Sequence, residues 1–338
     1  MASRLVLAVA GSGKTRCIIE ELDPNKRTLI LTYTIANHQN ILDRIISKFG
    51  YLPQSFHVRK YVSFLYGFCY QPFLQDALET KGLIFDRAPR YGNGLRRWVS
   101  IGGYLYNNRI FQLILNRVGG HELITRLNRF YDQVYVDEVQ DFAGHDFDFI
   151  ELLNEFNGNV LCVGDYYQHT FDTSTDGNKN GRLHSTYQEF VRRFTSAGYE
   201  VDTESLNHSW RCSPTVCRAV NNLGIEISSN KQNDSEVIRV TSENEVREII
   251  ENNSIIKLFR ECSSNFEIRS MNWAVSKGID HFKDVCVVLN NGTRDLWNNQ
   301  DLENMNHRTK CKLYVAMTRA NRNLFIVDES QVKKILRN

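Results

Sequence analysis

The 338-residue sequence has almost no excess charge of either sign, since 41 Lys and Arg residues oppose 39 Asp and Glu residues. Net charge therefore gives no argument for nucleic acid, and any such site must be a local groove. No apolar stretch is long enough to cross a membrane, and the apolar start RLVLAVAG runs into a glycine-rich segment without a signal-peptide cleavage pattern. These absences predict a soluble cytoplasmic protein with no membrane partner.

The eight cysteines form no CxxC pair and show no spacing typical of a zinc site. Several stand inside apolar runs, such as Cys162 in VLCVG and Cys286 in VCVVL. We expect reduced cysteines that pack as small hydrophobic residues rather than disulfides or metal ligands.

The chain is longer than one ordinary domain and favours two. Short β-branched runs alternate with helical stretches, and the pattern restarts after residue 200. Nearly continuous apolar runs are typical of parallel strands in a sheet covered on both faces. The sequence therefore predicts an α/β fold with domains at 1–202 and 203–338, a short insertion near 72–125 and a polar loop at 173–182. The expected strands lie at 4–10, 27–34, 133–139, 159–165, 284–290 and 323–329, and the expected helices include 14–22, 36–49, 104–118 and 146–156.

The segment AVAGSGKT follows an expected strand and opens an expected helix, which is the context of a phosphate-binding loop. Its glycines let backbone amides turn toward a phosphate, the Lys14 ammonium supplies a point charge, and the Thr15 hydroxyl is a ligand for Mg²⁺. Ala8 stands where the common form of the loop has glycine, and the alternative is an ordinary glycine-rich turn. The predicted nucleotide-binding residues are Ala10, Gly11, Ser12, Gly13, Lys14 and Thr15.

An acidic pair in YVDEVQD ends another expected strand. Asp137 is expected to hold Mg²⁺ together with Thr15. Glu138 is expected to act as the general base that polarises the attacking water. Such a pair alone is usually a solvated turn, but together with the phosphate loop it indicates nucleoside triphosphate hydrolysis.

In order and spacing these motifs resemble those of the UvrD-like superfamily 1 helicases. LTYTIAN resembles the motif whose aromatic residue, here Tyr33, contacts single-stranded DNA, and YVDEVQD resembles the family's DExxQD box. VGDYYQHTF resembles VGDxxQSIY, which implies that Gln168 lies near the γ-phosphate and Phe171 on the DNA path. LNHSWRCSP resembles LxxNYRS, which implies that Trp210 stacks on adenine and Arg211 reaches the γ-phosphate.

Two later motifs and one looser match extend the resemblance. SKGIDHFKDVCVVL is similar to the family's SKGLEFDVVFL, which implies a nucleotide site that includes Gly278, with Asp280 where a Glu contacts the ribose. LYVAMTRA is similar to YVxxTRA and makes Arg319 the second arginine on the γ-phosphate. VRKYVSFL resembles the TFHS region loosely and places Phe64 on the DNA path.

The resemblance implies two RecA-like P-loop NTPase domains in tandem, with ATP at their interface and Mg²⁺ as cofactor. Relatives carry an adenine-reading motif upstream of the phosphate loop and larger accessory subdomains. In this sequence seven residues precede Ala8. The two segments in which relatives carry their accessory subdomains, 72–132 and 212–271, span about 60 residues each. We therefore expect a compact form with reduced accessory subdomains.

The leading hypothesis is an ATP-dependent single-stranded DNA translocase or helicase, with 3′-5′ polarity implied by the resemblance and RNA left open as the substrate. The alternative is a regulatory ATPase subunit whose nucleotide state controls a partner, such as a nuclease in DNA processing or phage defence. A small-molecule kinase is disfavoured, because it has no use for Arg211 and Arg319 on a second α/β domain. Stimulation by short oligonucleotides distinguishes the motor from the regulatory subunit.

Overall fold

The computed structural model describes residues 3–86, 88–89, 92–174 and 178–337. It divides into two compact units. The first comprises Met1–Val6, Lys14–Gly164 and Phe171–Asp202, and the second comprises Leu7–Gly13, Asp165–Thr170 and Thr203–Asn338. Of the polar loop expected at 173–182, residues 175–177 lie outside the described part. So do residues 87, 90 and 91 of the expected insertion.

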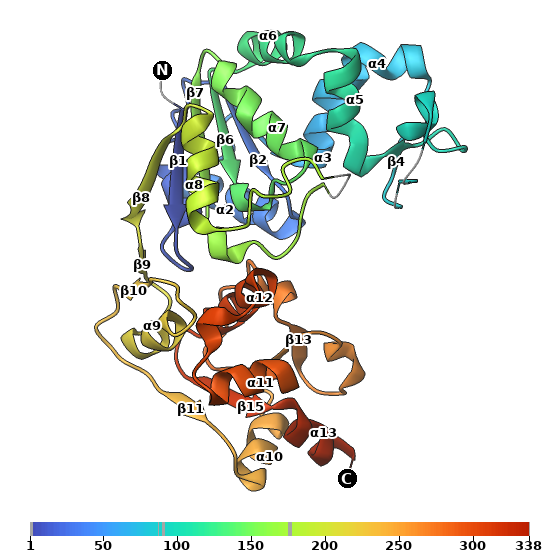
Figure 1. Cartoon of the computed structure of the whole chain (residues 1–338). Coiled ribbons are helices and arrows are strands. Elements are labelled where there is room, and N and C mark those ends of the chain that lie inside the picture. Colours follow the sequence, from blue (N-terminus) through green and yellow to red (C-terminus); the bar gives the residue numbers. More distant parts are fainter. Residues whose placement is uncertain (1–2, 87, 90–91, 175–177, 338) are drawn as a thin grey trace. The chain divides into compact units, whose positions relative to one another are not determined.

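The first unit is built around a six-stranded sheet in the order β3-β2-β6-β7-β1-β8 (Figure 1). The pairs β2–β3, β2–β6 and β6–β7 are parallel. A two-stranded sheet, β4–β5, lies in the inserted segment. The elements are β1 Ser3–Ala8, α1 Lys14–Glu20, β2 Thr28–Thr32, α2 Ile35–Phe49, β3 Phe56–Lys60, α3 Tyr61–Phe64, α4 Gln71–Leu78, β4 Leu83–Ile84, β5 Leu105–Tyr106, α5 Ile110–Arg117, α6 Gly120–Phe130, β6 Gln133–Asp137, α7 His145–Leu152, β7 Asn159–Gly164, α8 Tyr187–Ser196 and β8 Glu200–Leu206.

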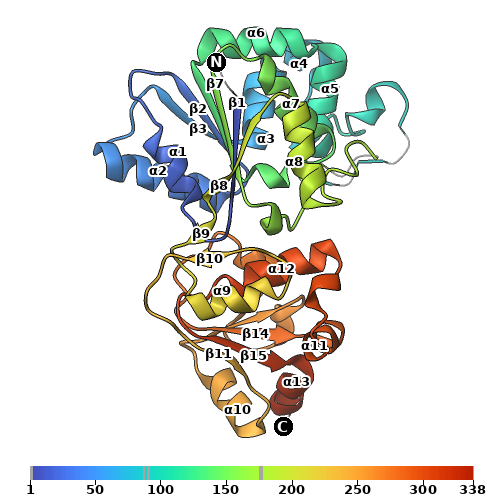
Figure 2. The same ribbon diagram turned by 60° about the vertical axis from the view of Figure 1, so that its left-hand side comes forward.

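Helices cover both faces of this sheet. Figure 2 shows α1 and α2 on one face and α7 and α8 on the other. Every residue of β2 and of β6 is buried, as strands with two covered faces require. The expected α/β architecture is therefore confirmed for this unit.

Local signals in the sequence define the ends of α2. The Thr34 hydroxyl accepts a hydrogen bond from the Asn37 amide and satisfies a donor of the first turn. At the other end Gly50 has φ 80°, and its N–H donates to the carbonyl of Ile46. A left-handed residue at this position costs glycine little, so the helix ends there.

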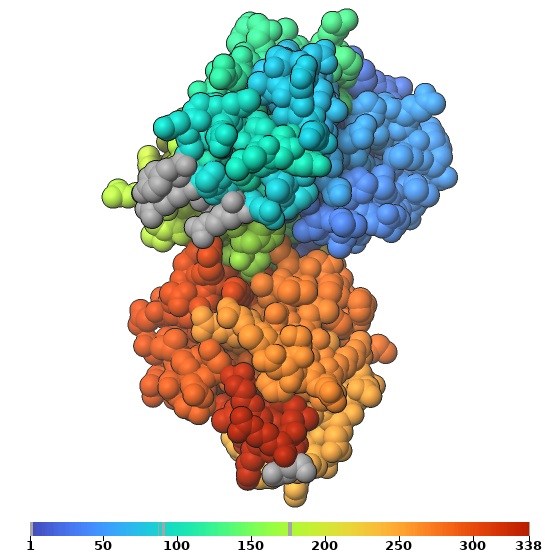
Figure 3. All heavy atoms as spheres, turned by 90° about the vertical axis from the view of Figure 1, so that its right-hand side faces the viewer, coloured from blue at the N-terminus to red at the C-terminus, as the bar shows by residue number. Residues whose placement is uncertain are grey.

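The inserted segment forms part of the surface of the first unit, where Figure 3 shows it in cyan to teal. A π-helix at Leu65–Tyr70 joins α3 to α4. The helix expected at 104–118 is shorter in the structure, where the short strand β5 precedes α5. The exposed apolar side chains here include Phe85, Ile101 and Tyr104.

One buried acid of the first unit has an unusual environment. Asp146, in the first turn of α7, is buried and accepts a hydrogen bond from the Tyr61 hydroxyl at 3.3 Å. Burial raises the pKa of this carboxyl from 3.8 to about 7, although hydrogen bonds from Thr173 and Tyr61 oppose the shift. The protonated form is therefore the more stable one inside the fold up to near neutral pH.

Asp146→Asn is expected to remove a pH dependence of stability. Between pH 4 and 7 the unfolded chain has lost this proton while the folded chain keeps it, so the free energy of unfolding of the wild type falls as pH rises. The stability of the variant relative to wild type should thus increase by a few kcal/mol over this range, at about 1.4 kcal/mol for each pH unit. Urea unfolding at pH 4.5, 6 and 7.5 measures it, with the exposed Asp43→Asn as control. A constant difference at all three pH values would contradict the assignment.

The second unit contains a five-stranded sheet in the order β11-β15-β14-β12-β13, in which all neighbouring pairs are parallel. A short parallel pair, β9–β10, lies apart from it. The elements are β9 His208–Ser209, α9 Pro214–Asn221, β10 Ser228–Ser229, β11 Val237–Arg239, α10 Glu243–Glu251, β12 Ile256–Phe259, β13 Ser270–Asn272, β14 Val285–Leu289, α11 Asn291–Asn298, α12 His307–Met317, β15 Leu324–Asp328 and α13 Glu329–Arg337.

Alternate residues of β14 enter two separate cores. Val285, Val287 and Leu289 pack with α9 and α12 on one face. Cys286 and Val288 pack with α10 and α13 on the other. Side chains of a strand alternate between faces, so a strand between two helix layers must be apolar throughout. This accounts for the continuous run VCVVL.

The cysteines agree with their expected role in packing. Six of the eight are buried: Cys69, Cys162, Cys212, Cys217, Cys286 and Cys311. None of the eight, all of which the structure describes, forms a disulfide. Within the described residues, no helix combines the length and the apolar character that a bilayer span needs.

Candidate nucleotide site

The two glycines of the predicted phosphate loop have backbone conformations that favour glycine. Gly11 has φ 74° and Gly13 has φ 102°. A Cβ atom at Gly11 would lie 2.6 Å from the Cβ of Arg211 and 2.9 Å from the Ser209 hydroxyl. The Trp210 amide donates to the carbonyl of Gly11 at 2.9 Å. Any side chain at position 11 would therefore force the loop away from the segment that carries Arg211.

A tyrosine connects this loop to two other motifs inside the second unit. The Ala10 amide donates to the Tyr314 hydroxyl at 2.7 Å, and that hydroxyl donates to Asp165 Oδ2 at 3.0 Å. Gln168 Nε2 donates to the same carboxylate oxygen at 2.9 Å. All these groups are buried, so each hydrogen bond replaces contact with water and the set defines the loop's position.

The two residues expected to bind phosphate and Mg²⁺ begin helix α1 in the first unit. Lys14 is its first residue and Thr15 its second, and both are half-buried. The side chains of Asp137 and Glu138, at the end of β6, are buried. Mg²⁺ prefers oxygen ligands, commonly one or two carboxylates with phosphate and water. The Thr15 hydroxyl and the Asp137 carboxylate fit that donor set.

Glu138 is held in a constrained conformation. Its φ of 54° lies in the left-handed region, which is costly for a residue with a Cβ. Its Oε2 accepts from Gln140 Nε2 at 2.6 Å, and its Oε1 lies 3.5 Å from Asn37 Nδ2. Its amide donates to Asp137 Oδ1 at 3.0 Å. Strain of this kind concentrates at functional sites, where surrounding contacts maintain it.

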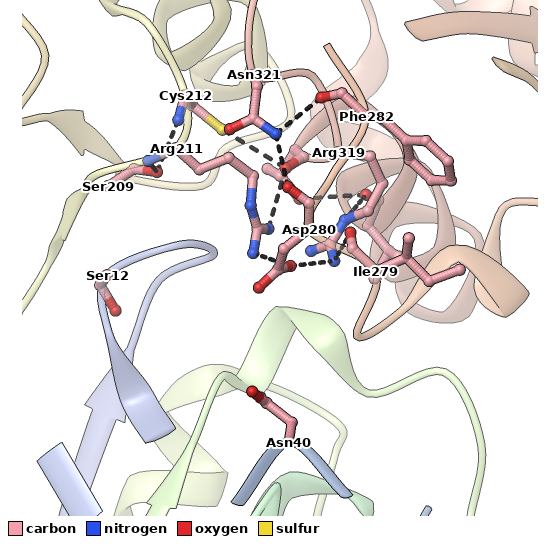
Figure 4. A network of polar contacts seen from close by, with 12 residues as sticks. Ser12, Asn40, Ser209, Arg211, Cys212, Ile279, Asp280, Phe282, Arg319 and Asn321 are labelled. Carbon is pink, nitrogen blue, oxygen red and sulfur yellow. Dashed lines mark hydrogen bonds and ion pairs between the residues drawn. The ribbon is translucent and has the colours of Figure 1, made fainter. Parts of the chain in front are cut away.

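Arg211 and Arg319 share one acidic partner within the second unit (Figure 4). Nη2 of Arg211 donates to Asp280 Oδ1, and its Nη1 donates to the Thr318 carbonyl at 3.2 Å. Nη1 of Arg319 lies 3.6 Å from the same Asp280 oxygen. Two guanidinium groups from separate sequence motifs thus lie against the same carboxylate. Asp280, expected to contact a ribose, forms an ion pair with both arginines in this structure.

Arg319 is almost completely enclosed, with 1% of its surface exposed. Its Nε donates to the Val315 carbonyl at 3.1 Å and its Nη1 to the Ile279 carbonyl at 3.2 Å. Burial, and after it the charge of Arg211, lower the pKa of this guanidinium to about 10, although Asp280 opposes the shift. A cation in this position depends strongly on a nearby anion.

Trp210 and Gln168 differ in their availability to a ligand. The Trp210 side chain is 62% exposed, so its indole face is open to a stacking partner such as a purine. Gln168 is buried, and its backbone carbonyl accepts a hydrogen bond from Lys277 Nζ at 2.9 Å. Gly278 follows Lys277 with φ 80°, which turns the chain toward Asp280.

The three aromatic residues expected on a nucleic-acid path have different surroundings. Tyr33 and Phe171 are half-buried neighbours in the first unit, with ring centroids 5.1 Å apart. Phe64 is 2% exposed and packs against Phe68 and Phe149 in the core. The expectation that Phe64 contacts DNA does not agree with this placement, because an enclosed ring has no free face on which a base can stack.

Sequence reasoning did not single out Tyr314, Asn37 or Asn321. Tyr314 stands in the same LYVAMTRA segment as Arg319, so the motif contained it without indicating its partners. Asn37 ends LTYTIAN and faces Glu138. Asn321 directly follows the motif, and nothing in its sequence context indicates that its side chain holds the loop of Asp280.

No family model matches the sequence, and a search of curated proteins gives no match. Solved structures do match. The structure of PRRSV helicase is 17% identical with a TM-score of 0.48, over 99% of this chain and 54% of that chain. A complex of Arterivirus nonstructural protein 10 (helicase) with DNA is 16% identical with a TM-score of 0.51, over 100% of this chain and 63% of that chain.

The second comparison shows the fold. The chain has a helicase-like fold with two parallel sheets, consistent with tandem RecA-like domains. It spans less than two thirds of the length of either helicase chain. At sequence identities of 16% and 17%, the roles of individual residues cannot be transferred from these helicases. The roles of residues in the site therefore rest on the geometry of this chain.

Proposed function

We propose that the chain hydrolyses ATP and uses the reaction to move along single-stranded nucleic acid, as a helicase or translocase of the UvrD-like type. The observation that supports this most directly is the packing of Gly11 against Arg211. A phosphate loop and an arginine segment in contact provide two of the parts that phosphoryl transfer needs. The helicase-like fold supports the same class of activity.

Each residue of the site has a role in this proposal. Lys14 binds the β- and γ-phosphates, and Thr15 and Asp137 would hold Mg²⁺, which neutralises phosphate charge when bound. Glu138 accepts a proton from the attacking water. Its neighbours Gln140 and Asn37 fix the orientation of the carboxylate by hydrogen bonds. A base with fixed orientation needs no rearrangement at the moment of reaction.

Arg211 and Arg319 act on the γ-phosphate in the same proposal, and Trp210 stacks on the adenine. Guanidinium groups bind phosphate oxygens through paired N–H donors and stabilise charge that develops in the transition state. The exposed indole of Trp210 supports its assignment, since a stacking face must be free.

Single-stranded DNA is the proposed track, with RNA as the other candidate and 3′-5′ as the direction. Tyr33 and Phe171 provide the stacking surface, because bases stack on aromatic rings regardless of sequence, at about 1–3 kcal/mol for each base. The similar structure that contains DNA supports the choice of nucleic acid as partner.

Lys14→Ala tests the nucleotide site. The variant should lose most Mg-ATP binding, about a hundredfold or more, because the phosphates lose their nearest fixed charge. Calorimetric titration with Mg-ATP measures the loss, and Lys26→Ala, an exposed lysine on the loop after α1, is the control. Equal affinity in the two variants would refute the site.

Addition of short oligonucleotides to the wild-type chain tests the motor. ATP hydrolysis that rises several-fold with single-stranded DNA or RNA supports translocation. A rate that responds to a protein partner and to neither nucleic acid would instead identify a regulatory ATPase.

A further inference from the structure

The loop that carries Asp280 wraps around Arg319. Gly278 turns the chain, the Ile279 carbonyl accepts from Arg319 Nη1, and the Asp280 carboxylate faces the same guanidinium. Asn321 Nδ2 donates to the carbonyls of Asp280 and Phe282, each at 2.8 Å (Figure 4). Asn321, two residues after Arg319, thus fixes the position of the loop whose Asp280 carboxylate pairs with Arg319.

We propose that Asp280 is an internal competitor for the phosphate groups of the nucleotide: its carboxylate hydrogen-bonds Arg211 and forms an ion pair with Arg319, the two cations that a phosphate would bind. The inference rests on the proposed function for the identity of the anion. It concerns the affinity of the two arginines for that anion, and it gives Asp280 a role other than contact with the ribose.

The contacts themselves support competition. A carboxylate and a phosphate both present pairs of anionic oxygens to guanidinium N–H groups, and an N–H that donates to one is not free for the other. Both arginines direct a terminal nitrogen to one oxygen, Oδ1 of Asp280. Arg211 is held further by the Thr318 carbonyl, which is a neutral acceptor and compensates no charge.

Burial makes the separation unequal for Arg319 and Asp280. Arg319 is 1% exposed, whereas the Asp280 side chain is 54% exposed. An enclosed cation retains a large part of its attraction to an anion, whereas an exposed carboxylate recovers hydration when it leaves. Asp280 can therefore withdraw into water when a phosphate takes its place, while Arg319 stays where Val315 and Ile279 hold it.

Contact with the ribose and competition for the arginines predict opposite effects of one substitution. Asp280→Asn keeps the size of the side chain and an acceptor oxygen but removes the charge. If the residue binds ribose, the variant should bind ATP more weakly and tripolyphosphate, which has no ribose, unchanged. If it competes with phosphate, both ligands should bind more tightly and by a similar factor.

The experiment titrates wild type and Asp280→Asn with ATP and with tripolyphosphate by calorimetry, without added metal and at low salt. We expect both affinities to rise by on the order of tenfold, the effect of removing a partly buried ion pair. Asp295→Asn, an exposed acid on α11 paired with Arg294, controls for the loss of one negative charge. Its affinities should stay within about twofold of wild type.

A second variant covers the case in which Asp280→Asn does not fold. Asn321→Ala removes the two hydrogen bonds that hold the loop and leaves every charge in place, so tripolyphosphate should bind about two- to fivefold more tightly. Unchanged or weaker tripolyphosphate binding in both variants overturns the competition. If ATP hydrolysis is intact in that case, the proposed function survives alone. If neither wild type nor variants bind either ligand, both proposals fail.

Discussion

Replacement of Glu138 by glutamine is expected to lower the rate of ATP hydrolysis by about 10²- to 10⁴-fold while Mg-ATP binding stays within a few-fold of wild type. The carboxylate is the proposed acceptor of the proton from the attacking water, and an amide cannot accept it. The ground-state complex does not need that proton transfer, so affinity for the nucleotide should be retained.

The surroundings of Glu138 make this substitution a clean test. Gln140 Nε2 donates to Oε2, and the amide oxygen of a glutamine can accept the same bond. The opposite end of the new amide then faces Asn37, whose own amide can turn its oxygen toward it. The backbone at φ 54° costs glutamine and glutamate the same, so the free energy of unfolding should change little.

Single-turnover hydrolysis and calorimetric Mg-ATP binding measure the two quantities separately. Glu122→Gln, the same chemical change at an exposed position of α6, should leave both unchanged. Hydrolysis at the wild-type rate in Glu138→Gln would show that the base is another group. Loss of binding together with loss of rate would show that position 138 shapes the site rather than accepting a proton.

The strands that sequence reasoning found are those with apolar side chains toward both faces. β2, β6 and β14 are buried throughout, and their composition alone predicts them. β12 is equally buried, yet Lys257 interrupts its apolar run. Lys257 is itself fully buried, and its ammonium is accommodated there by donating to the Asn252 backbone carbonyl at 2.7 Å. Such a compensation involves a residue outside the strand, and a local pattern cannot indicate it.

Two other strands, β8 and β3, lack a continuous apolar run because they lie at the edges of the first sheet. β8 is an edge strand, and most of its residues are exposed or half-buried. β3 is also at an edge, with its residues alternating between buried or half-buried and exposed. Edge strands have one hydrogen-bonded neighbour and less covering structure, so polar side chains are tolerated there. Their positions follow from the completed sheet rather than from their own composition.

The candidate site shows the same division between local and distant information. The positive φ angles at Gly11 and Gly13 follow from a motif of eight residues. The contact of Ala10 with Tyr314 joins residues 304 positions apart, and the pairing of Arg211 with Asp280 joins residues 69 apart. Phe64 illustrates the converse, since an aromatic residue next to a motif has the same appearance in sequence whether it meets a ligand or the core.

Arg319→Lys is expected to lower the rate of ATP hydrolysis by about a hundredfold or more and to change the affinity for Mg-ATP much less. Lysine keeps the positive charge but has no paired planar donors, so it cannot follow the charge that spreads over the phosphate oxygens in the transition state. Alanine is a poorer choice, because it would leave the Val315 and Ile279 carbonyls without their donor and open a cavity in the core. Steady-state kinetics with independent measurement of Mg-ATP binding separates the two effects. Arg322→Lys, three residues further on and paired with Asp284, is the matched control.

Combination of Arg319→Lys with Asp280→Asn links this prediction to the competition for phosphate. If Asp280 acts through Arg319, the gain in tripolyphosphate affinity caused by Asp280→Asn should shrink when residue 319 is lysine, because the ammonium pairs less tightly with the carboxylate that was removed. A coupling of at least about threefold in affinity is expected from the four-variant cycle, since residues in one ion-pair network are not additive. If the effects of the two substitutions on tripolyphosphate affinity are strictly additive, Asp280 acts through Arg211 alone or through the electrostatic field of its loop. A rate loss in Arg319→Lys that is matched by an equal loss of Mg-ATP affinity would place the guanidinium in ground-state binding and exclude its transition-state role.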